Sequence, residues 1–581
     1  MTEPIDYAKL ESAIGLNWYQ VDPDLRALMD RYLPPEDRGW AEERLQRWGE
    51  ICGGPIAANA EVIDRNPPQL ERYDAWGNET NRVVHNASTI DTKRYIWEEG
   101  PHALDVAGKE VPGVLRSAFT YLLSQSDTGM VCATGMTDGV IDLVRRHAPA
   151  GIREEMMAHF MAPSFDDGWD GAMFMTELRG GSDLATTDTT ARQKDDKTWL
   201  LNGSKWFCSN VDAKAIATLA RPEGADPGLR GLALFVVPAT RADGTPNGIH
   251  VKRIKDKLGT RSVPTAEVDF VDAEAHILSD PKEGSSESRG FNRMMSMVNG
   301  SRLGVALMGL GIARRCLLEG SIYAAHREAF GRRLDELPLM QETLLQMAVE
   351  VEAAAAIVFE AASVAGRTGD EEARRLYRIL VPLAKFRAAR RGLEVASQGL
   401  EVLGGNGYIE NWPLARQFRD AQCHTIWEGT ENIISLDVLR AIAKEHAHDA
   451  LLGRVDEALT NADHPALASV RGAVEGARSE AVEALGVIAS LPKDLQLLHA
   501  RRLTGLLADL IQAALLTEAA AAELAKDGSA RKAAVAQLFV RENLEERRLR
   551  GISGDRSVLE LFGPVTRHEP LEPKALAAAT Q

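Results

Sequence analysis

Three features of the sequence predict a mainly α-helical protein with a central β domain. Residues 1–170, and the chain from 286 onward, space their apolar side chains three and four apart, as amphipathic helices do. From 171 to 285, short β-branched and aromatic segments alternate with turn residues, which is typical of a compact β domain. At 581 residues the chain is also too long for one hydrophobic core, so we expect several domains.

The N-terminal range, 1–170, is predicted to be a helical domain with an extension. Helical spacing is clearest in "PDLRALMDRYL", "EERLQRWGEICGG" and "VIDLVRRHA", and Pro and Gly residues fall between these runs. The first residues, "MTEPIDYAKLESAIG", have neither the basic nor the apolar region of an export signal. We therefore expect a cytoplasmic protein.

The second domain, 171–285, is predicted to be a β-barrel or sandwich. Its strand candidates are "AMFMTEL", "TTDTTARQ", "TWLLNGSKWFCSN", "AIATLARP", "GLALFVVPAT", "GIHVKRIKDKLG" and "TAEVDFVDA". The polar segment "DPKEGSSESRGF", 280–291, is expected to be the loop that leaves this domain.

Long helices are predicted for the rest of the chain. The stretches "RLGVALMGLGIARRCLLEGSIYAAH", "LMQETLLQMAVEVEAAAAIVFEAASVAG" and "RRLYRILVPLAKFRAARRGLEVASQGLEVLGG" each exceed twenty residues, which suits a bundle of antiparallel helices over 286–445. An additional Ala/Leu-rich helical domain is expected over 446–581.

Composition argues against several classes of partner. The chain is 45% hydrophobic and 26% charged, as ordinary globular proteins are, and no apolar run approaches the roughly 20 residues of a membrane span. A net charge of −17 argues against nucleic acid as the main partner. The five cysteines lack metal-site spacing and are expected to be buried free thiols, so no metal is expected.

The β domain contains two candidate binding segments. In "TELRGGSDLATTD", Thr176 precedes a tight turn over 180–183 whose exposed N–H groups suit a phosphate, although an ordinary hairpin loop fits equally well. In "NGSKWFCSN", strand alternation sends Phe207 and Ser209 to one face. An aromatic ring and a hydroxyl there could stack on and bond to a flat heterocycle, and plain strand packing remains the alternative.

The bundle offers further candidates. Arg327 could be a surface charge, and the glycine pair Gly404–Gly405 could be a helix C-cap or allow close approach of a diphosphate. In "IWEGTENI", Glu428 stands between Trp427 and Gly429 just before a helix. An acid at this point could be an exposed helix-start residue favoured by the helix dipole, or a catalytic carboxylate.

In this order and at these spacings, the segments over about 100–445 resemble the flavin-dependent acyl-CoA dehydrogenases. "MTELRGGSD" is similar to the family's TEPxAGSD, "NGSKWFCSN" to NGxKxWITN, "REAFG" to RxxFG, "LGGNGY" to GGxGY and "IWEGTENI" to YEGTxxI. Trp206–Phe207, "RGGSD", Glu401 and the length resemble the adaptive-response, AidB-like branch, which has an extra C-terminal helical domain.

The resemblance implies a reaction and a base. Glu428 corresponds to the base that removes the α-proton of an acyl-CoA thioester while hydride leaves Cβ for flavin N5. Relatives with the base on the neighbouring helix carry it just before an Arg, but here Ser301 precedes Arg302. Trp427 replaces the usual Tyr and would exclude water, and the resemblance places Ser182, Arg302 and Trp427 at the substrate.

The resemblance also implies an FAD site. The implied contacts are Thr176, Gly181, Ser182, Phe207, Ser209, Arg327, Phe330, Gln341, Gly404, Gly405, Thr430 and Asn432. Five of these contacts would come from a partner subunit: Arg327, Phe330, Gln341, Gly404 and Gly405. The resemblance therefore implies a homo-oligomer, a dimer of dimers. Glu401 replaces a common Gln, and an acid suits a diphosphate poorly.

Three functions are compatible with the sequence. The first is a dehydrogenase of fatty acid metabolism that passes electrons to an electron-transfer flavoprotein, and the second is an acyl-CoA oxidase on the same scaffold. The third is an AidB-like, DNA-associated protective flavoprotein. This last function needs a basic C-terminal domain, yet residues 441–581 contain 17 Lys and Arg against 20 Asp and Glu.

Overall fold

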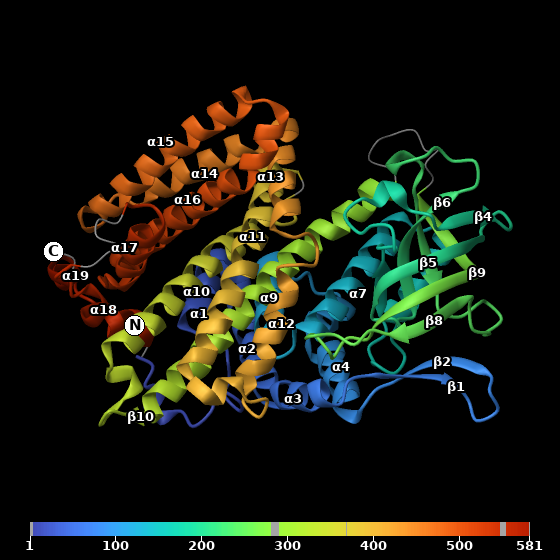
Figure 1. The fold of residues 1–581 in the computed structure, drawn as a ribbon, viewed down its shortest axis with the longest axis horizontal. Helices are drawn as coiled ribbons and strands as arrows, with labels where there is room; N and C mark the ends of the chain where they lie inside the picture. Colours follow the sequence, from blue (N-terminus) through green and yellow to red (C-terminus); the bar gives the residue numbers. More distant parts are fainter. Residues whose placement is uncertain (1–3, 280–289, 368, 547–552, 580–581) are drawn as a thin grey trace. The chain divides into compact units, whose positions relative to one another are not determined.

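The computed structural model describes residues 4–279, 290–367, 369–546 and 553–579, and it divides the chain into two compact units (Figure 1). The first unit combines Met1–Gly54, Pro112–Gln125 and Val305–Gln581, and the second combines Pro55–Val111 and Ser126–Gly304. The predicted exit loop falls, over 280–289, outside the described residues. The four domains proposed from the sequence stay a prediction, whereas the mainly helical fold with a central sheet is confirmed.

The centre of the second unit is a β-barrel. Its strands are β3 (Gly171–Phe174), β4 (Thr190–Gln193), β5 (Trp199–Ser209), β6 (Ala215–Pro222), β7 (Ala233–Pro238), β8 (Ile249–Ile254) and β9 (Thr265–Ser279). They pair in the order β3-β6-β4-β5-β9-β7, and β6 also pairs with β7, which closes the sheet. Closure leaves β3 and β8 as the strands outside the ring, so few strand edges remain unpaired.

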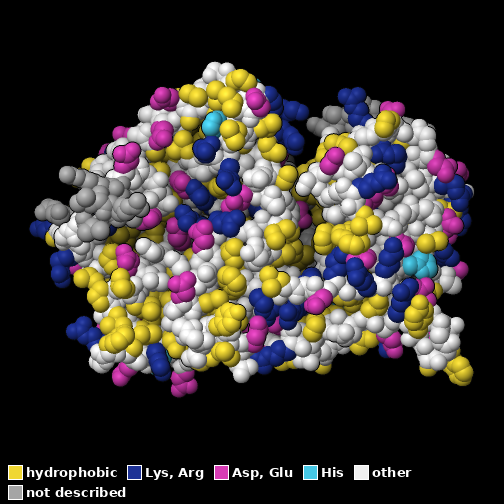
Figure 2. Space-filling view, viewed as in Figure 1, with side chains coloured by type: hydrophobic (Ala, Val, Ile, Leu, Met, Phe, Trp, Pro, Cys, Tyr) yellow, Lys and Arg dark blue, Asp and Glu magenta, His cyan; other side chains and the backbone are white. Residues whose placement is uncertain are grey.

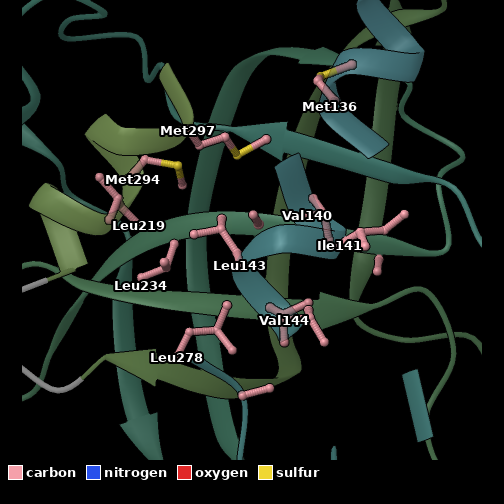
Figure 3. Packing of buried hydrophobic residues seen from close by; sticks show 14 of the residues in the cluster. Met136, Val140, Ile141, Leu143, Val144, Leu219, Leu234, Leu278, Met294 and Met297 are labelled. Carbon is pink, nitrogen blue, oxygen red and sulfur yellow. The ribbon is translucent and has the colours of Figure 1, made fainter. Parts of the chain in front are cut away.

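Helices cover this barrel. The helical segments of the unit are η2 (Cys52–Ile56, shared with the first unit), α3 (Ala57–Arg65), α4 (Ala87–Glu99), α5 (Pro101–Val106), α7 (Thr128–His147), α8 (Ala150–Phe160), η3 (Leu184–Thr186), η4 (Leu229–Gly231) and the start of α9 (Gly290–His326). Figure 3 shows Val140 and Val144 of α7 facing Leu219 and Leu234 of the sheet, with Met297 of α9 beside them. These side chains form one buried cluster, so α7 and α9 are fixed against the barrel by apolar packing.

A β-hairpin within the second unit was not predicted. Strands β1 (Gln69–Tyr73) and β2 (Glu79–Val84) pair antiparallel within the range expected to be helical. Their side chains are mostly exposed on both faces, so the sequence shows no apolar alternation there. The turn is held by Asp74, whose carboxylate accepts from the N–H groups of Trp76 and Asn78 at 2.8 Å.

The first unit is helical, apart from the short strands β10 (Glu328–Ala329) and β11 (Arg332–Arg333). Its α-helices are α1 (Pro23–Tyr32), α2 (Pro35–Ile51), α6 (Gly113–Ser124), the rest of α9, α10 (Pro338–Val364), α11 (Glu371–Val402), α12 (Pro413–His424), α13 (Glu431–Glu445), α14 (Ala447–Asn461), α15 (Ala468–Ser490), α16 (Lys493–Asp527), α17 (Arg531–Asn543), α18 (Ser557–Arg567) and α19 (Pro573–Ala579). Its 3₁₀ turns are η1 (Tyr7–Lys9), η5 (Leu334–Glu336), η6 (Gly404–Tyr408) and η7 (Pro465–Leu467).

A buried ion-pair network joins the C-terminal helices to the bundle. Arg454 of α14 donates to Glu360 of α10 at 2.7 Å and to Glu518 of α16 at 2.6 Å. Glu360 also accepts from the hydroxyl of Tyr32, and Glu518 from the amide of Asn461, both at 2.6 Å. Because a buried charge needs a partner, these bonds make α14 and α16 part of the same unit as α10.

A second network adds the N-terminal segment and α17. Glu352 of α10 pairs with Arg531 and, at 2.8 Å, with Lys532. Lys532 also donates to Asp24 of α1 at 2.7 Å. Residues more than 500 positions apart in the sequence therefore share one charged cluster. In this cluster the free-energy cost of burying each charge is offset by the opposite charges beside it.

Helix α16 is the one helix in the described ranges that is long and apolar enough to cross a membrane. This description rests on its length and composition, and 72% of its most apolar window is buried inside the protein. The core helix of a bundle has the same properties. It packs against the C-terminal helices α14, α15 and α17 and also against α10, α11 and α13 of the bundle (Figure 1).

We predict that Arg454→Met lowers the free energy of unfolding by about 3–5 kcal/mol, because it leaves Glu360 and Glu518 buried without their cation. Urea unfolding followed by circular dichroism measures the change. Arg478→Met is the matched control, since its pair with Asp456 is largely exposed and should contribute at most about 1 kcal/mol. Equal stability losses for the two variants would contradict the conclusion that the buried Arg454 network stabilises the first unit.

Candidate active site

The loop after β3 is attached to strand β5. The carbonyl of Thr176 accepts from the N–H of Trp206 at 2.9 Å. Glu177 and Gly180 exchange backbone hydrogen bonds of 3.1 and 3.3 Å, which closes a tight turn over 177–180, directly before the turn predicted over 180–183. The two motifs that the sequence analysis proposed separately therefore form one surface in the second unit.

A buried ion pair lies behind this surface. Lys205, whose side chain is fully buried, donates to Glu177 at 2.7 Å and to the carbonyl of Leu219 at 2.9 Å. Burial alone would raise the pKa of Glu177, but the charge of Lys205 and hydrogen bonds from Thr189 and Asp188 hold it below the usual value. Because Glu177 adjoins Thr176 and Lys205 adjoins Trp206, the pair fixes both segments of the surface.

Aromatic and hydroxyl side chains line the surface. Phe207 is 55% exposed and Ser209 is half-buried, while Cys208 between them is fully buried, so these three residues alternate as predicted. A register shift between Lys205 and Cys208 interrupts the alternation before Phe207. The Ser209 hydroxyl lies 3.0 Å from that of Thr265. Lys255 places its Nζ 3.6 Å from the centre of the Trp206 ring and 5.0 Å from that of Phe207.

The turn leaves room for an anion. A Cβ on Gly181 would lie 3.1 Å from the Thr176 hydroxyl, so glycine keeps this side of the loop open. Gly181 and Ser182 are exposed, and Asp183 uses its carboxylate to cap the next turn at the N–H of Ala185. An exposed phenyl ring, hydroxyls and an open glycine turn on one surface fit a flat heterocycle with an attached phosphate.

Arg302 lies in the second unit, on α9. Its side chain is 5% exposed and donates to Asn299 at 3.2 Å. The hydroxyl of the preceding Ser301 bonds to the carbonyl of Met297 at 3.2 Å. The role at the substrate that the resemblance implies for Arg302 stays a prediction.

Glu428 lies in the first unit, on the turn between α12 and α13. Both Glu428 and Gly429 have positive φ, +54° and +105°, which is uncommon for a residue with a Cβ. The turn begins with two N–H groups, those of Ile426 and Trp427, donating to the carbonyl of Cys423 at 2.9 and 3.0 Å. A half-buried carboxylate is thus held in a costly backbone conformation, as functional side chains often are.

Two buried side chains lie beneath this turn. Lys385 of α11, 1% exposed, donates from Nζ to the carbonyl of Gly429. His424, fully buried, stacks on Trp427 with ring centres 5.6 Å apart. Burial, together with the charge of Lys385, lowers the pKa of His424 to about 3, so its ring is neutral at physiological pH.

The start of α13 is open for a ligand. Thr430 is the N-cap residue, but its side chain makes no capping hydrogen bond, and both Thr430 and Asn432 are exposed. Glu431 between them is bound by Arg390 of α11 at 2.8 Å. The hydroxyl and the amide lie at a helix N-terminus, a position that favours anions.

The β10–β11 hairpin presents an aromatic ring to solvent. Its two central residues, Phe330 and Gly331, have φ of +55° and +74°, as a two-residue hairpin turn requires. Phe330 is 95% exposed, and Arg327 just before the hairpin is exposed as well. Gln341 is half-buried and donates to the carbonyl of Asp335 at 2.9 Å.

The glycine pair ends α11. Gly404 has φ of +60°, and an added Cβ would meet no atom within 4 Å at either Gly404 or Gly405. Both glycines and Glu401 are exposed. This geometry is compatible with both predictions made for the glycine pair, a helix C-cap and a site that a diphosphate can approach closely.

The groups that hold these segments in place were not predicted from the sequence: Lys205 with Glu177, Lys255, Lys385 and His424. One signal was present for Lys385, since it lies within the apolar run "ILVPLAKF" of a long helix. A cation at such a position needs a buried partner. All five cysteines are free, three of them (Cys52, Cys208 and Cys316) buried as expected and the other two half-buried.

Comparison with known families assigns most of the chain. Residues 9–167 match the adaptive response protein AidB N-terminal domain. Residues 172–273 match the acyl-CoA dehydrogenase middle domain, and residues 288–443 match the acyl-CoA dehydrogenase C-terminal domain.

Individual relatives agree with this assignment. The chain is 34% identical over 465 residues to acyl-CoA dehydrogenase family member 11 of Caenorhabditis elegans, covering 77% of this chain and 74% of the relative. It is 32% identical over 433 residues to the AidB protein of Escherichia coli strain K12, covering 71% and 76%. The crystal structure of C. elegans ACDH-11 in complex with C11-CoA superposes with a TM-score of 0.83 and 29% identity, covering 96% of this chain and 98% of that one.

We predict that Lys205→Met destabilises the protein by about 3–5 kcal/mol at pH 7, because Glu177 then lacks its cation. Lys194→Met, which removes a partly exposed pair with Glu274, is the control and should cost at most about 1 kcal/mol. Unfolding in urea followed by tryptophan fluorescence measures both.

The Lys205→Met effect should depend on pH. The folded-state pKa of Glu177 is lowered, so its contribution is present above the ordinary glutamate pKa of about 4.3 and is lost as the pH falls through the lowered value. The difference between wild type and variant should therefore shrink in acid. A difference that stays constant from pH 7 to pH 3 would show that the charge of Glu177 is not involved.

Proposed function

The chain belongs to the acyl-CoA dehydrogenase family, in the branch with an AidB-type N-terminal domain, and from that premise we propose that it oxidises an acyl-CoA thioester at Cα and Cβ. The cofactor is FAD, and a flavoprotein is the electron acceptor. The observation that carries the proposal is Glu428, a half-buried carboxylate held in a left-handed turn between Trp427 and Gly429.

Glu428 is the base. Its carboxylate accepts the α-proton of the thioester. The position directly before Arg302, where some relatives carry the base, is Ser301 here, so it offers no second candidate. Trp427, stacked on the neutral His424, covers one side of the turn and limits access of water to the carboxylate. The rigid turn keeps the carboxylate in one orientation, which reduces the entropy lost when the substrate is aligned.

The surface around Phe207 and Thr176 fits the flavin. Phe207 would flank the ring and the hydroxyls of Thr176 and Ser209 would bond to its polar edge, while the Gly181–Ser182 turn suits a phosphate. When bound, FAD supplies the acceptor for the hydride equivalent that leaves Cβ. In this proposal Ser182 and Arg302 bind the CoA ester. The preferred acyl chain is to be identified by experiment.

The assembly we propose is a homotetramer, a dimer of dimers. Exposed Arg327, Phe330, Gly404 and Gly405 contact the FAD of a partner subunit, as the family resemblance implies. A phenyl ring that is 95% exposed on a turn of positive φ is costly for an isolated chain and supports a role in contact with another molecule.

DNA binding has less support. Lys and Arg side chains are interleaved with Asp and Glu over the visible face of the C-terminal helices in Figure 2. Ion pairs of these helices include Arg478 with Asp456 and Arg471 with Asp463. Such mixed charge does not provide the basic surface that phosphate neutralisation needs.

We predict that Glu428→Gln keeps bound FAD but slows flavin reduction by at least about 10²–10⁴-fold, because the amide cannot accept the α-proton. Anaerobic bleaching of the flavin spectrum measures the rate with a chain-length panel of acyl-CoAs that includes C11-CoA, the ligand of the C. elegans structure. Glu428→Asp should retain part of the activity, since the carboxylate is shortened but present. Reduction of the Gln variant at the wild-type rate would place the base elsewhere.

We predict that Arg327→Ala loses FAD affinity, whereas Arg332→Ala, an exposed arginine of the same hairpin, does not. Hybrids test whether Arg327 acts on the partner's site. A dimer of one Arg327→Ala chain and one Phe207→Asp chain keeps one intact FAD site if Arg327 acts in trans and none if it acts in cis. Light scattering and flavin content measure the assembly and the occupancy, and an FAD-loaded monomer would refute the arrangement.

A further inference from the structure

Helix α11 bonds to the Glu428 segment through three cations. Arg378 pairs with Asp437 of α13 at 2.8 Å, and Arg390 donates to Glu431 at the start of α13 at 2.8 Å. Between them, Lys385 donates to the carbonyl of Gly429. Arg378 and Lys385 are seven residues apart, two helical turns, so they lie on the same face of α11.

Lys385 differs from the two arginines in its acceptor. The arginines bind carboxylates of α13, whereas Lys385 binds a backbone carbonyl in the turn itself. That carbonyl belongs to Gly429, directly after the carboxylate-bearing Glu428, and both residues have positive φ. A fully buried ammonium on this carbonyl opposes relaxation of the turn to an ordinary backbone conformation, because relaxation would leave both groups buried without each other.

His424 supports the turn from the other end. Its ring is fully buried, its stacking partner is Trp427, and neither ring nitrogen has a hydrogen-bond partner among the described residues. The ring therefore contributes shape and contact area at this position. The turn is thus bounded by a ring stack before Glu428 and an ammonium–carbonyl bond after it.

We propose that Lys385 is a positioning residue for Glu428: through the Gly429 carbonyl it holds the turn that aims the carboxylate at the substrate. His424 completes this support by fixing Trp427. The inference rests on the proposed function, in which Glu428 is the base. It assigns Lys385 no contact with substrate or cofactor, and it predicts that loss of the ammonium affects the chemical step more than binding.

The test compares Lys385→Met, which keeps the length of the side chain and removes the donor, with wild type. Flavin content, the dissociation constant from the spectral shift on titration with C11-CoA, and the rate of anaerobic flavin reduction by C11-CoA are measured. We expect unchanged flavin content, a dissociation constant within about 3-fold of wild type, and a reduction rate lowered about 10²-fold, the size that a displacement near 1 Å can produce. Lys385→Arg, which restores a donor, should recover most of the rate, and His424→Ala should lower the rate less than Lys385→Met.

Arg387→Met is the matched control on the same helix. Arg387 bonds to Asp509 and to the carbonyl of Gly505 in α16, so this variant weakens packing of α11 without touching the Glu428 turn. Its reduction rate should equal that of wild type. Equal rate losses for Arg387→Met and Lys385→Met would show a general loss of stability and overturn the inference.

Glu428→Gln separates this inference from the proposed function. A slow Glu428→Gln with a Lys385→Met that reduces at the wild-type rate refutes only the positioning role. If both variants reduce at the wild-type rate, the proposed function itself fails. If Lys385→Met does not fold, His424→Ala decides: a wild-type reduction rate overturns the inference, and slowed reduction with retained C11-CoA affinity supports it.

Discussion

Arg454 shares its guanidinium between the buried carboxylates of Glu360 and Glu518, and most of the first unit depends on pairing of this kind. A charge removed from water needs an opposite charge close by, so each such residue fixes the position of the element that carries its partner. Asp24, Glu352 and Lys532 extend the principle to the N-terminal segment and α17. Helices from both ends of the chain are therefore held against α10, and the C-terminal helices are an integral part of the bundle.

The same physical rule acts on a smaller scale at the candidate functional segments of each unit. Lys205 with Glu177 holds the surface proposed for the flavin, and Lys385 holds the turn that carries Glu428. In each case a buried ammonium lies behind the reactive surface and bonds to its backbone or to a neighbouring carboxylate. Glu428 and Phe330 have positive φ, which is a backbone conformation of higher energy for residues with a Cβ. Such positions persist when the surrounding structure prevents relaxation to a conformation of lower energy.

Much of the fold was predictable from the sequence. The seven strand segments were found from short β-branched and aromatic runs between turn residues, and the long helices were found from apolar side chains spaced three and four apart. Hairpin β1–β2 was missed because its side chains are exposed on both faces and show no alternation. The roles of Glu428, Thr176 and Phe207 were inferred from the family resemblance. The comparisons confirm the family and the AidB-type N-terminal domain.

The sequence by itself predicted which residues are candidates for the chemistry, because the Glu428 segment "IWEGTENI" and the phenyl–hydroxyl pair in "NGSKWFCSN" belong to short local patterns that resemble those of the family. Only the tertiary structure decided what holds them. Lys385 lies 43 positions before Glu428, Lys205 lies 28 positions after Glu177, and Arg531 lies 179 positions after Glu352. Pairings over such separations are set by how helices and strands pack in three dimensions, and local spacing carries no information about them. The candidate residues of the proposed reaction are therefore visible in one sequence, and the buried partners that hold their segments become visible only in the fold.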